Sequence, residues 1–111
     1  MWFVFPQIAG LGGSAMSRRF AIAGLDEARA YLQHPILGAR LRECVTVLRV
    51  LGASRSTSAV EIFGQVDAMK LRSCLTLFLR AAPEEKLFSE VLDRFFGGAP
   101  DEATDERLRA C

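Results

Sequence analysis

An excess of charge of either sign is missing from this sequence. Its 14 lysines and arginines are balanced by 13 aspartates and glutamates, so the formal net charge at pH 7 is +1. Domains that bind nucleic acids usually carry a clear basic excess. The composition therefore argues against a dedicated nucleic-acid-binding protein, and it predicts neither an acidic nor a basic partner.

Long hydrophobic runs are missing as well, although the first 17 residues carry no charged side chain. Pro6, Gln7 and the glycines at 10, 12 and 13 divide that segment into apolar pieces of at most five residues. A membrane span needs about 20 apolar residues, and a signal peptide needs a basic start before a longer apolar stretch. We therefore expect a cytoplasmic protein that makes no contact with a membrane.

Cysteine and histidine are scarce. Cys44, Cys74 and Cys111 are widely spaced without a CxxC pair, and His34 is the single histidine. This pattern disfavours a disulfide framework and a zinc site alike, and we expect neither a metal nor a cofactor. Because Cys44 and Cys74 fall on apolar helix faces, we expect both thiols to pack as small hydrophobic groups.

Large apolar side chains are concentrated at the start of the chain. Trp2, Phe3, Val4 and Phe5 follow the first methionine, and burying each such side chain contributes roughly 1.5–3 kcal/mol. Two interpretations follow. Either this irregular segment docks in the core as a central element, or a helix that normally covers it precedes it and is absent from this chain.

Apolar residues recur at helical spacing along most of the sequence. The clearest stripe combines Leu37, Leu41, Val45 and Leu48, which follow the i, i+4, i+8 pattern of a buried helix face. No linker or repeat interrupts the chain, so we expect one all-α domain over residues 1–111, a compact bundle of about six or seven short helices. The expected helices are 14–23, 26–33, 36–51, 58–63, 67–82, 84–96 and 101–111.

The loop before the first expected helix is a candidate anion site. Gly12, Gly13 and Ser14 stand at that helix start, and Arg18 and Arg19 follow. Free backbone N–H groups and the positive end of the helix dipole favour phosphate at such a position. The spacing of a nucleotide-binding loop is lacking, however, and a glycine loop with a serine cap explains the same residues.

A few polar residues elsewhere are candidates for chemistry or binding. His34 is the one side chain suited to acid–base work near neutral pH, although it also fits a capping role between two helices. Lys70 and Ser73 share a face close to an apolar stripe, where they can hold an anion or simply bond to the helix backbone. Gln7 is expected to be half-buried and to orient either backbone or ligand.

Several long motifs together resemble one family. They cover nearly the whole chain, in order: Trp2–Gln7, Gly10–Ser14, Glu27–Pro35, Ile62–Gly64, Lys70–Phe78 and Val91–Gly98. The chain resembles the domain-of-unknown-function 1810 family. This resemblance implies a compact, mainly α-helical bacterial protein without an established activity. Relatives carry about one more helix upstream of the Trp2 motif, so we expect this chain to lack that N-terminal helix.

Two function hypotheses remain open, and the sequence does not decide whether the protein is an enzyme. The first is a domain that binds or processes a small phosphorylated or nucleotide-derived ligand. A more distant resemblance, to the helical domain family that acts on NAD- and ADP-ribose-derived metabolites, implies the same ligand class. Its expected site combines Trp2, Gln7, Gly12, Gly13, Ser14, His34, Lys70 and Ser73.

The alternative is a non-enzymatic interaction module. In that case the aromatic opening of the chain, Trp2 to Phe5, forms an exposed patch that recruits a partner or mediates a weak homo-oligomer. A chain that is only marginally stable without its upstream helix is a third possibility, because a lost helix removes burial comparable to the total stability of about 5–15 kcal/mol.

Overall fold

The computed structural model describes residues 6, 22–54 and 64–110, and this part of the chain forms five helices without a strand. The all-α prediction is confirmed there, with fewer helices than the six or seven expected. The helices expected at 14–23 and 58–63 and the aromatic opening lie outside the described residues, except for Pro6, which is buried. The helices are α2 (Leu25–Gln33), α3 (Leu37–Ser54), α5 (Gln65–Ala81), α6 (Lys86–Phe96) and α7 (Glu102–Ala110).

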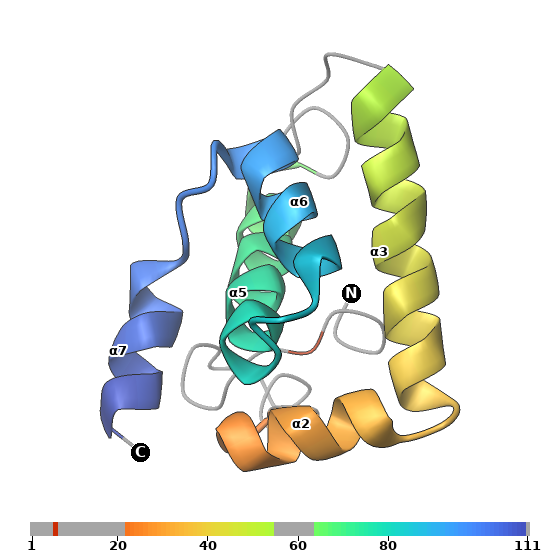
Figure 1. Cartoon of the computed structure of the whole chain (residues 1–111). Helices are drawn as coiled ribbons and strands as arrows, with labels where there is room; N and C mark the ends of the chain where they lie inside the picture. The colour runs from red at the N-terminus through yellow and green to blue at the C-terminus, as the bar shows by residue number, and fades with distance from the viewer. Residues whose placement is uncertain (1–5, 7–21, 55–63, 111) are drawn as a thin grey trace.

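Helix α5 has the largest number of helical neighbours. It packs against α2, α6 and α7, while α3 packs against α2 and α6. In Figure 1, α3 and α7 lie on opposite flanks of the α5–α6 pair, and α2 crosses beneath them. Since α2 and α3 are consecutive, this arrangement requires a sharp corner between them, and the end of α5 lies close to that corner.

The core follows the helical periodicity of α5. Leu71, Cys74, Leu75 and Phe78 are fully buried at i, i+3, i+4 and i+7. The ring of Phe78 lies 5.5 Å from that of Tyr31 on α2 and 5.8 Å from that of Phe88 on α6. These are favourable separations for aromatic pairs. One buried stripe therefore joins three helices, and the expectation that Cys74 packs as a core residue is confirmed.

Glycine ends one of these helices and lies inside another. Gly97 ends α6 in the left-handed conformation, with φ 64°, because a residue without a Cβ adopts it at little cost. Its backbone N–H donates to the carbonyl of Asp93. Gly52 does not end α3, which continues to Ser54. A helix tolerates an internal glycine at a cost of about 1 kcal/mol, so the helix expected at 36–51 extends beyond its predicted end.

The starts of two helices also differ from expectation. Helix α5 begins at Gln65 after Gly64, two residues before the expected start at Asp67, which therefore lies in the first turn. Helix α6 begins at Lys86, with Glu85 at the N-cap position. No helix in the described part of the chain is long and apolar enough to span a membrane.

Candidate functional site

A groove of about 640 Å³ opens where the end of α2, the start of α3 and the α5–α6 turn meet. Two helix C-termini and two helix N-termini converge at this place, so several backbone groups there have no partner within their own helix. The groove is lined by Arg29, Leu32, Gln33, Arg42, Ala81, Ala82, Pro83, Glu84 and Glu85.

Arg42 joins three of the elements around the groove. It comes from the second turn of α3, and its Nη1 donates to the carbonyl of Leu32, near the end of α2, over 2.9 Å. Its Nε donates to Oε1 of Glu85, before α6, over 2.6 Å. A cation at a helix C-terminus interacts favourably with the helix dipole. Arg42 thus stabilises the corner between α2 and α3 while facing the groove.

Arg29 plays the corresponding role for α5. Its Nε donates to the carbonyl of Ala81, the last residue of that helix, over 3.2 Å, and its Nη1 donates to Asp26. Within the described residues, Nη2 of Arg29 and Nη2 of Arg42 make no hydrogen bond. Each guanidinium carries five N–H donors in a planar fork. Two arginines from different helices therefore present unused donors around one groove.

The acidic residues of the groove differ in their surroundings. Glu84 is exposed. The carboxylate of Glu85 contacts Arg42 through Oε1, whereas its Oε2 is buried and has no hydrogen-bond partner among the described residues. An unpaired buried acceptor typically costs about 1–3 kcal/mol. Oε2 of Glu85 is therefore a buried acceptor whose hydrogen bonding is incomplete among the described residues.

His34 lies at the corner between α2 and α3, next to the groove residue Gln33. Its Nδ1 accepts hydrogen bonds from the backbone N–H groups of Ile36 and Leu37 over 3.2 and 3.1 Å. This imidazole nitrogen therefore acts as the cap of α3, one of the two roles considered from the sequence. It uses the neutral nitrogen as an acceptor, which fixes the ring tautomer.

Lys70 and Ser73 lie on the first half of α5, away from the groove at the end of that helix. The 11 residues from Lys70 to Ala81 correspond to about 16 Å along the helix axis. Nζ of Lys70 lies 3.8 Å from Oδ1 of Asp67. The hydroxyl of Ser73 has two acceptors within reach, the carbonyl of Met69 at 3.0 Å and Oδ2 of Asp101 at 3.1 Å.

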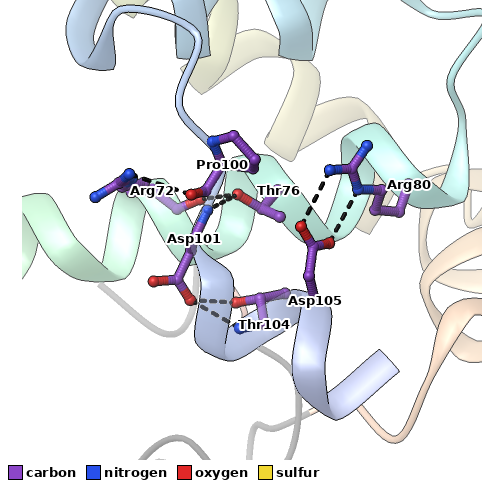
Figure 2. A network of polar contacts seen from close by, with 7 residues as sticks. All are labelled: Arg72, Thr76, Arg80, Pro100, Asp101, Thr104 and Asp105. Atoms are coloured by element: carbon purple, nitrogen blue, oxygen red, sulfur yellow. Dashed lines mark hydrogen bonds and ion pairs between the residues drawn. The ribbon is translucent and has the colours of Figure 1, made fainter. Parts of the chain in front are cut away.

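The contact between Ser73 and Asp101 belongs to a larger polar network between α5 and α7. Figure 2 shows Thr76, Asp101 and Thr104 of this network. Oδ2 of Asp101 also accepts from the backbone N–H and the hydroxyl of Thr104, over 3.0 and 2.6 Å, and so caps the start of α7. The backbone N–H of Asp101 donates to the buried hydroxyl of Thr76. We call these four residues, Ser73, Thr76, Asp101 and Thr104, the α5–α7 network.

Two arginines of α5 extend the attachment of α7. Arg72 donates to the carbonyls of Ala99 and Pro100. Arg80 binds both carboxylate oxygens of Asp105 over 3.0 Å (Figure 2), and this pairing raises the pKa of the guanidinium. The hydroxyls of the α5–α7 network have partners, so this cluster is explained by the packing of α7.

The ionisable groups of the core are unsuited to nucleophilic chemistry. Burial raises the pKa of the Cys74 thiol well above its ordinary value, and burial is also the main cause that raises the pKa of Tyr31. A thiol that stays protonated is a poor nucleophile and metal ligand. Within the described ranges, moreover, no three His, Cys, Asp or Glu side chains are grouped as metal ligands.

Of the residues expected to form a site, three are described, and they are not gathered in one place. His34 adjoins the groove, whereas Lys70 and Ser73 lie on the other half of α5. Trp2, Gln7, Gly12, Gly13 and Ser14 lie outside the described residues. Sequence reasoning missed Arg29, Arg42 and Glu85. Glu85 stands near the start of an expected helix, but Arg29 and Arg42 lie within expected helices, where a charged side chain carries no signal of a site.

Comparisons with known proteins agree with this fold. The chain is similar over 97% of its length to the crystal structure of the conserved hypothetical protein Rv1873 from Mycobacterium tuberculosis, with 44% identity and a TM-score of 0.89. It covers 75% of that protein. A comparison with curated proteins finds no match. The family described as "Protein of unknown function (DUF1810)" matches residues 1–108, so the chain belongs to the domain-of-unknown-function 1810 family.

Proposed function

We propose that this domain binds a small phosphorylated ligand in the groove between α2, α3 and the α5–α6 turn. The observation that carries the proposal is the pair of arginines: Arg29 and Arg42 come from different helices, line one groove, and each has an Nη2 group without a partner among the described residues. Planar guanidinium groups bind phosphate with two parallel hydrogen bonds.

The other properties of the groove support the same ligand class. Its volume of about 640 Å³ lies within the range of about 300–1,000 Å³ typical of small-molecule sites. Glu84 and Gln33 add exposed polar groups at its edge, and these groups accept hydrogen bonds from hydroxyls. A phosphate attached to a sugar matches both kinds of lining residue.

The experiment must separate ligand binding from the contacts that these arginines make with helix ends. We would titrate the protein with ADP-ribose, ribose 5-phosphate and inorganic phosphate by calorimetry, and repeat the titrations with Arg29→Lys and Arg42→Lys. Lysine keeps the charge but loses the planar fork. The matched control is Arg49→Lys, since Arg49 lies on α3 and pairs with Glu90, outside the groove.

We expect at least one phosphorylated compound to bind. Each groove variant should weaken that binding by about tenfold, which corresponds to about 1.4 kcal/mol, and Arg49→Lys should leave it unchanged. The proposal fails if the wild-type protein binds none of the three compounds. It also fails if the groove variants bind as tightly as the control while melting at the wild-type temperature.

A second candidate function is self-association, favoured by the exposed face of α3. Val47 and Val50 lie one turn apart there, with exposed fractions of 54% and 61%, and contiguous apolar surface of this kind marks interaction sites when it is large. Size-exclusion chromatography over a range of concentrations tests this candidate. Elution as a monomer at every concentration contradicts it, and a Val47→Lys variant should abolish any dimer observed.

A further inference from the structure

The carboxylate of Glu85 is used on one side only. Its Oε1 accepts from Nε of Arg42 over 2.6 Å, and its Oε2 is buried without a hydrogen-bond partner in the described part of the structure. An ionised carboxylate accepts through both oxygens. A hydrogen-bond acceptor that is removed from water and left unpaired is unfavourable. Oε2 of Glu85 can therefore still accept a hydrogen bond.

Glu85 does not cap helix α6 with its side chain. Glu85 occupies the N-cap position of α6, where a side-chain oxygen typically accepts from a backbone N–H of the first turn. Glu85 makes no such side-chain hydrogen bond. Its carboxylate lies against Arg42 instead, and both side chains line the groove. Helix capping therefore does not explain why an acidic residue stands at this position.

We infer that Glu85 determines specificity by accepting a hydrogen bond from a ligand hydroxyl next to the phosphate, so that the groove selects a phosphorylated sugar. This inference rests on the proposed function. The unused donors of Arg29 and Arg42 hold the phosphate, and Oε2 of Glu85 is the acceptor for a neighbouring hydroxyl. Oε2 is buried, so ligand binding requires the carboxylate to turn, and rotation about the last torsion of a glutamate side chain is broad enough to allow this.

The selection follows from what each ligand leaves unpaired. A phosphorylated sugar supplies a hydroxyl donor to Oε2 of Glu85, whereas a phosphate ester without a hydroxyl leaves this buried acceptor without a hydrogen-bond partner. Sites with a buried polar group of this kind discriminate strongly against analogues that lack the matching group. The hydroxyl is neutral, so the pairing of Glu85 with Arg42 is maintained when the ligand binds.

The test compares two ligands on three proteins by calorimetry. The ligands are ribose 5-phosphate and methyl phosphate, which share the phosphate and differ in the hydroxyls. The proteins are the wild type, Glu85→Gln and Glu106→Gln. Glutamine at 85 presents its carbonyl to Arg42 and places an NH₂ group, which is no acceptor, at the position of Oε2. Glu106→Gln makes the same change of charge on an exposed side chain of α7, outside the groove.

We expect the wild type and Glu106→Gln to bind ribose 5-phosphate at least about tenfold more tightly than methyl phosphate, a difference of about 1.4 kcal/mol. In Glu85→Gln the two affinities should become nearly equal. Equal affinities for the two ligands in the wild type overturn this inference while leaving the proposed phosphate site intact. Failure of the wild type to bind either ligand, or ADP-ribose, overturns the proposed function itself. A preference for ribose 5-phosphate over methyl phosphate that persists in Glu85→Gln overturns the inference. If Glu85→Gln does not fold, the comparison of the two ligands on the wild type decides the inference.

Discussion

Gly38 lies directly against the carbonyl group of Leu32, where the last turn of α2 meets the first turn of α3. A Cβ atom built on Gly38 would overlap the carbonyl oxygen and carbon of Leu32, which are backbone atoms and cannot move aside as a flexible side chain does. The carbonyl also accepts from Nη1 of Arg42. The corner beside the candidate groove therefore depends on a residue without a side chain.

Gly38→Ala should destabilise the protein, although helix propensity alone predicts the opposite. Alanine inside a helix is favoured over glycine by about 1 kcal/mol, whereas forced overpacking costs about 1–3 kcal/mol. We expect the clash to dominate, with a net loss of about 1–2 kcal/mol in the free energy of unfolding measured with urea. The control is Ala39→Gly at the neighbouring exposed position, which reports propensity alone. A more stable Gly38→Ala protein would show that the corner opens easily.

Asp101→Ala should release the start of α7. The change removes the acceptor for the N–H and hydroxyl of Thr104 and for the hydroxyl of Ser73. Loss of a cap and of partners for buried hydroxyls together cost about 2–3 kcal/mol. Urea unfolding measures the loss, and hydrogen exchange should show it concentrated in 102–110. Glu102→Ala, one residue further on and exposed, should change stability by less than about 0.5 kcal/mol.

The ion pair between Arg80 and Asp105 should contribute little despite its bidentate geometry. The side chain of Arg80 is 44% exposed, and pairs in contact with water typically contribute about 0.2–1 kcal/mol. A double-mutant cycle with Arg80→Ala and Asp105→Ala should therefore give a coupling energy of about 0.5 kcal/mol that falls at high salt. A coupling several times larger would mean that the pair is shielded from solvent.

Alkaline pH should destabilise the fold through Cys74 before Tyr31 contributes. The pKa of each group is raised in the folded state, above the ordinary values of 9.0 and 10.0. The stabilisation is therefore complete below the unfolded pKa and is lost as the pH rises through the folded pKa. Above pH 9 the unfolded chain releases the Cys74 proton while the folded chain keeps it, which lowers stability by up to about 1.4 kcal/mol per pH unit.

The Cys74→Ala variant isolates this effect. It should be less stable than the wild type at neutral pH, because it leaves a small cavity. Its stability should decrease less steeply than that of the wild type as the pH rises above 9, the ordinary pKa of a thiol. Urea unfolding at a series of pH values gives both slopes. Parallel slopes would mean that the thiol ionises as easily in the folded protein as in the unfolded chain.

The periodicity of single segments predicted most of the described fold. Leu41, Val45 and Leu48 were expected on one apolar face and are buried, because a helix of 3.6 residues per turn fixes which side chains face the core. Leu37, expected on the same face, is 37% exposed at the start of α3. Local signals at the helix ends were less decisive. Gly97 ends its helix, but Gly52 lies within one, since a glycine breaks a helix only where the tertiary structure lets the chain turn.

The candidate groove was beyond the reach of sequence reasoning. Arg29, Arg42 and Glu85 come from three separate segments, and only the sharp corner after α2 and the crossing of α5 bring them together. Ser73 illustrates the converse case. Its spacing to Lys70 suggested a ligand, but Asp101 lies 28 residues further along the chain and accepts its hydrogen bond. Both results depend on contacts between distant segments, which spacing along one helix does not encode.

The attachment of α7 has a consequence for how the fold opens. Among the described helices, α5 is the one that α7 packs against extensively, and the side chains that hold it are polar at several points (Figure 2). Breaking that contact surface leaves the mutual packing of the other four described helices in place. Among the described helices, α7 therefore has the properties of an independent unit of local unfolding, which exchanges its amide protons at a lower free energy than the core and becomes accessible to a protease before the other four.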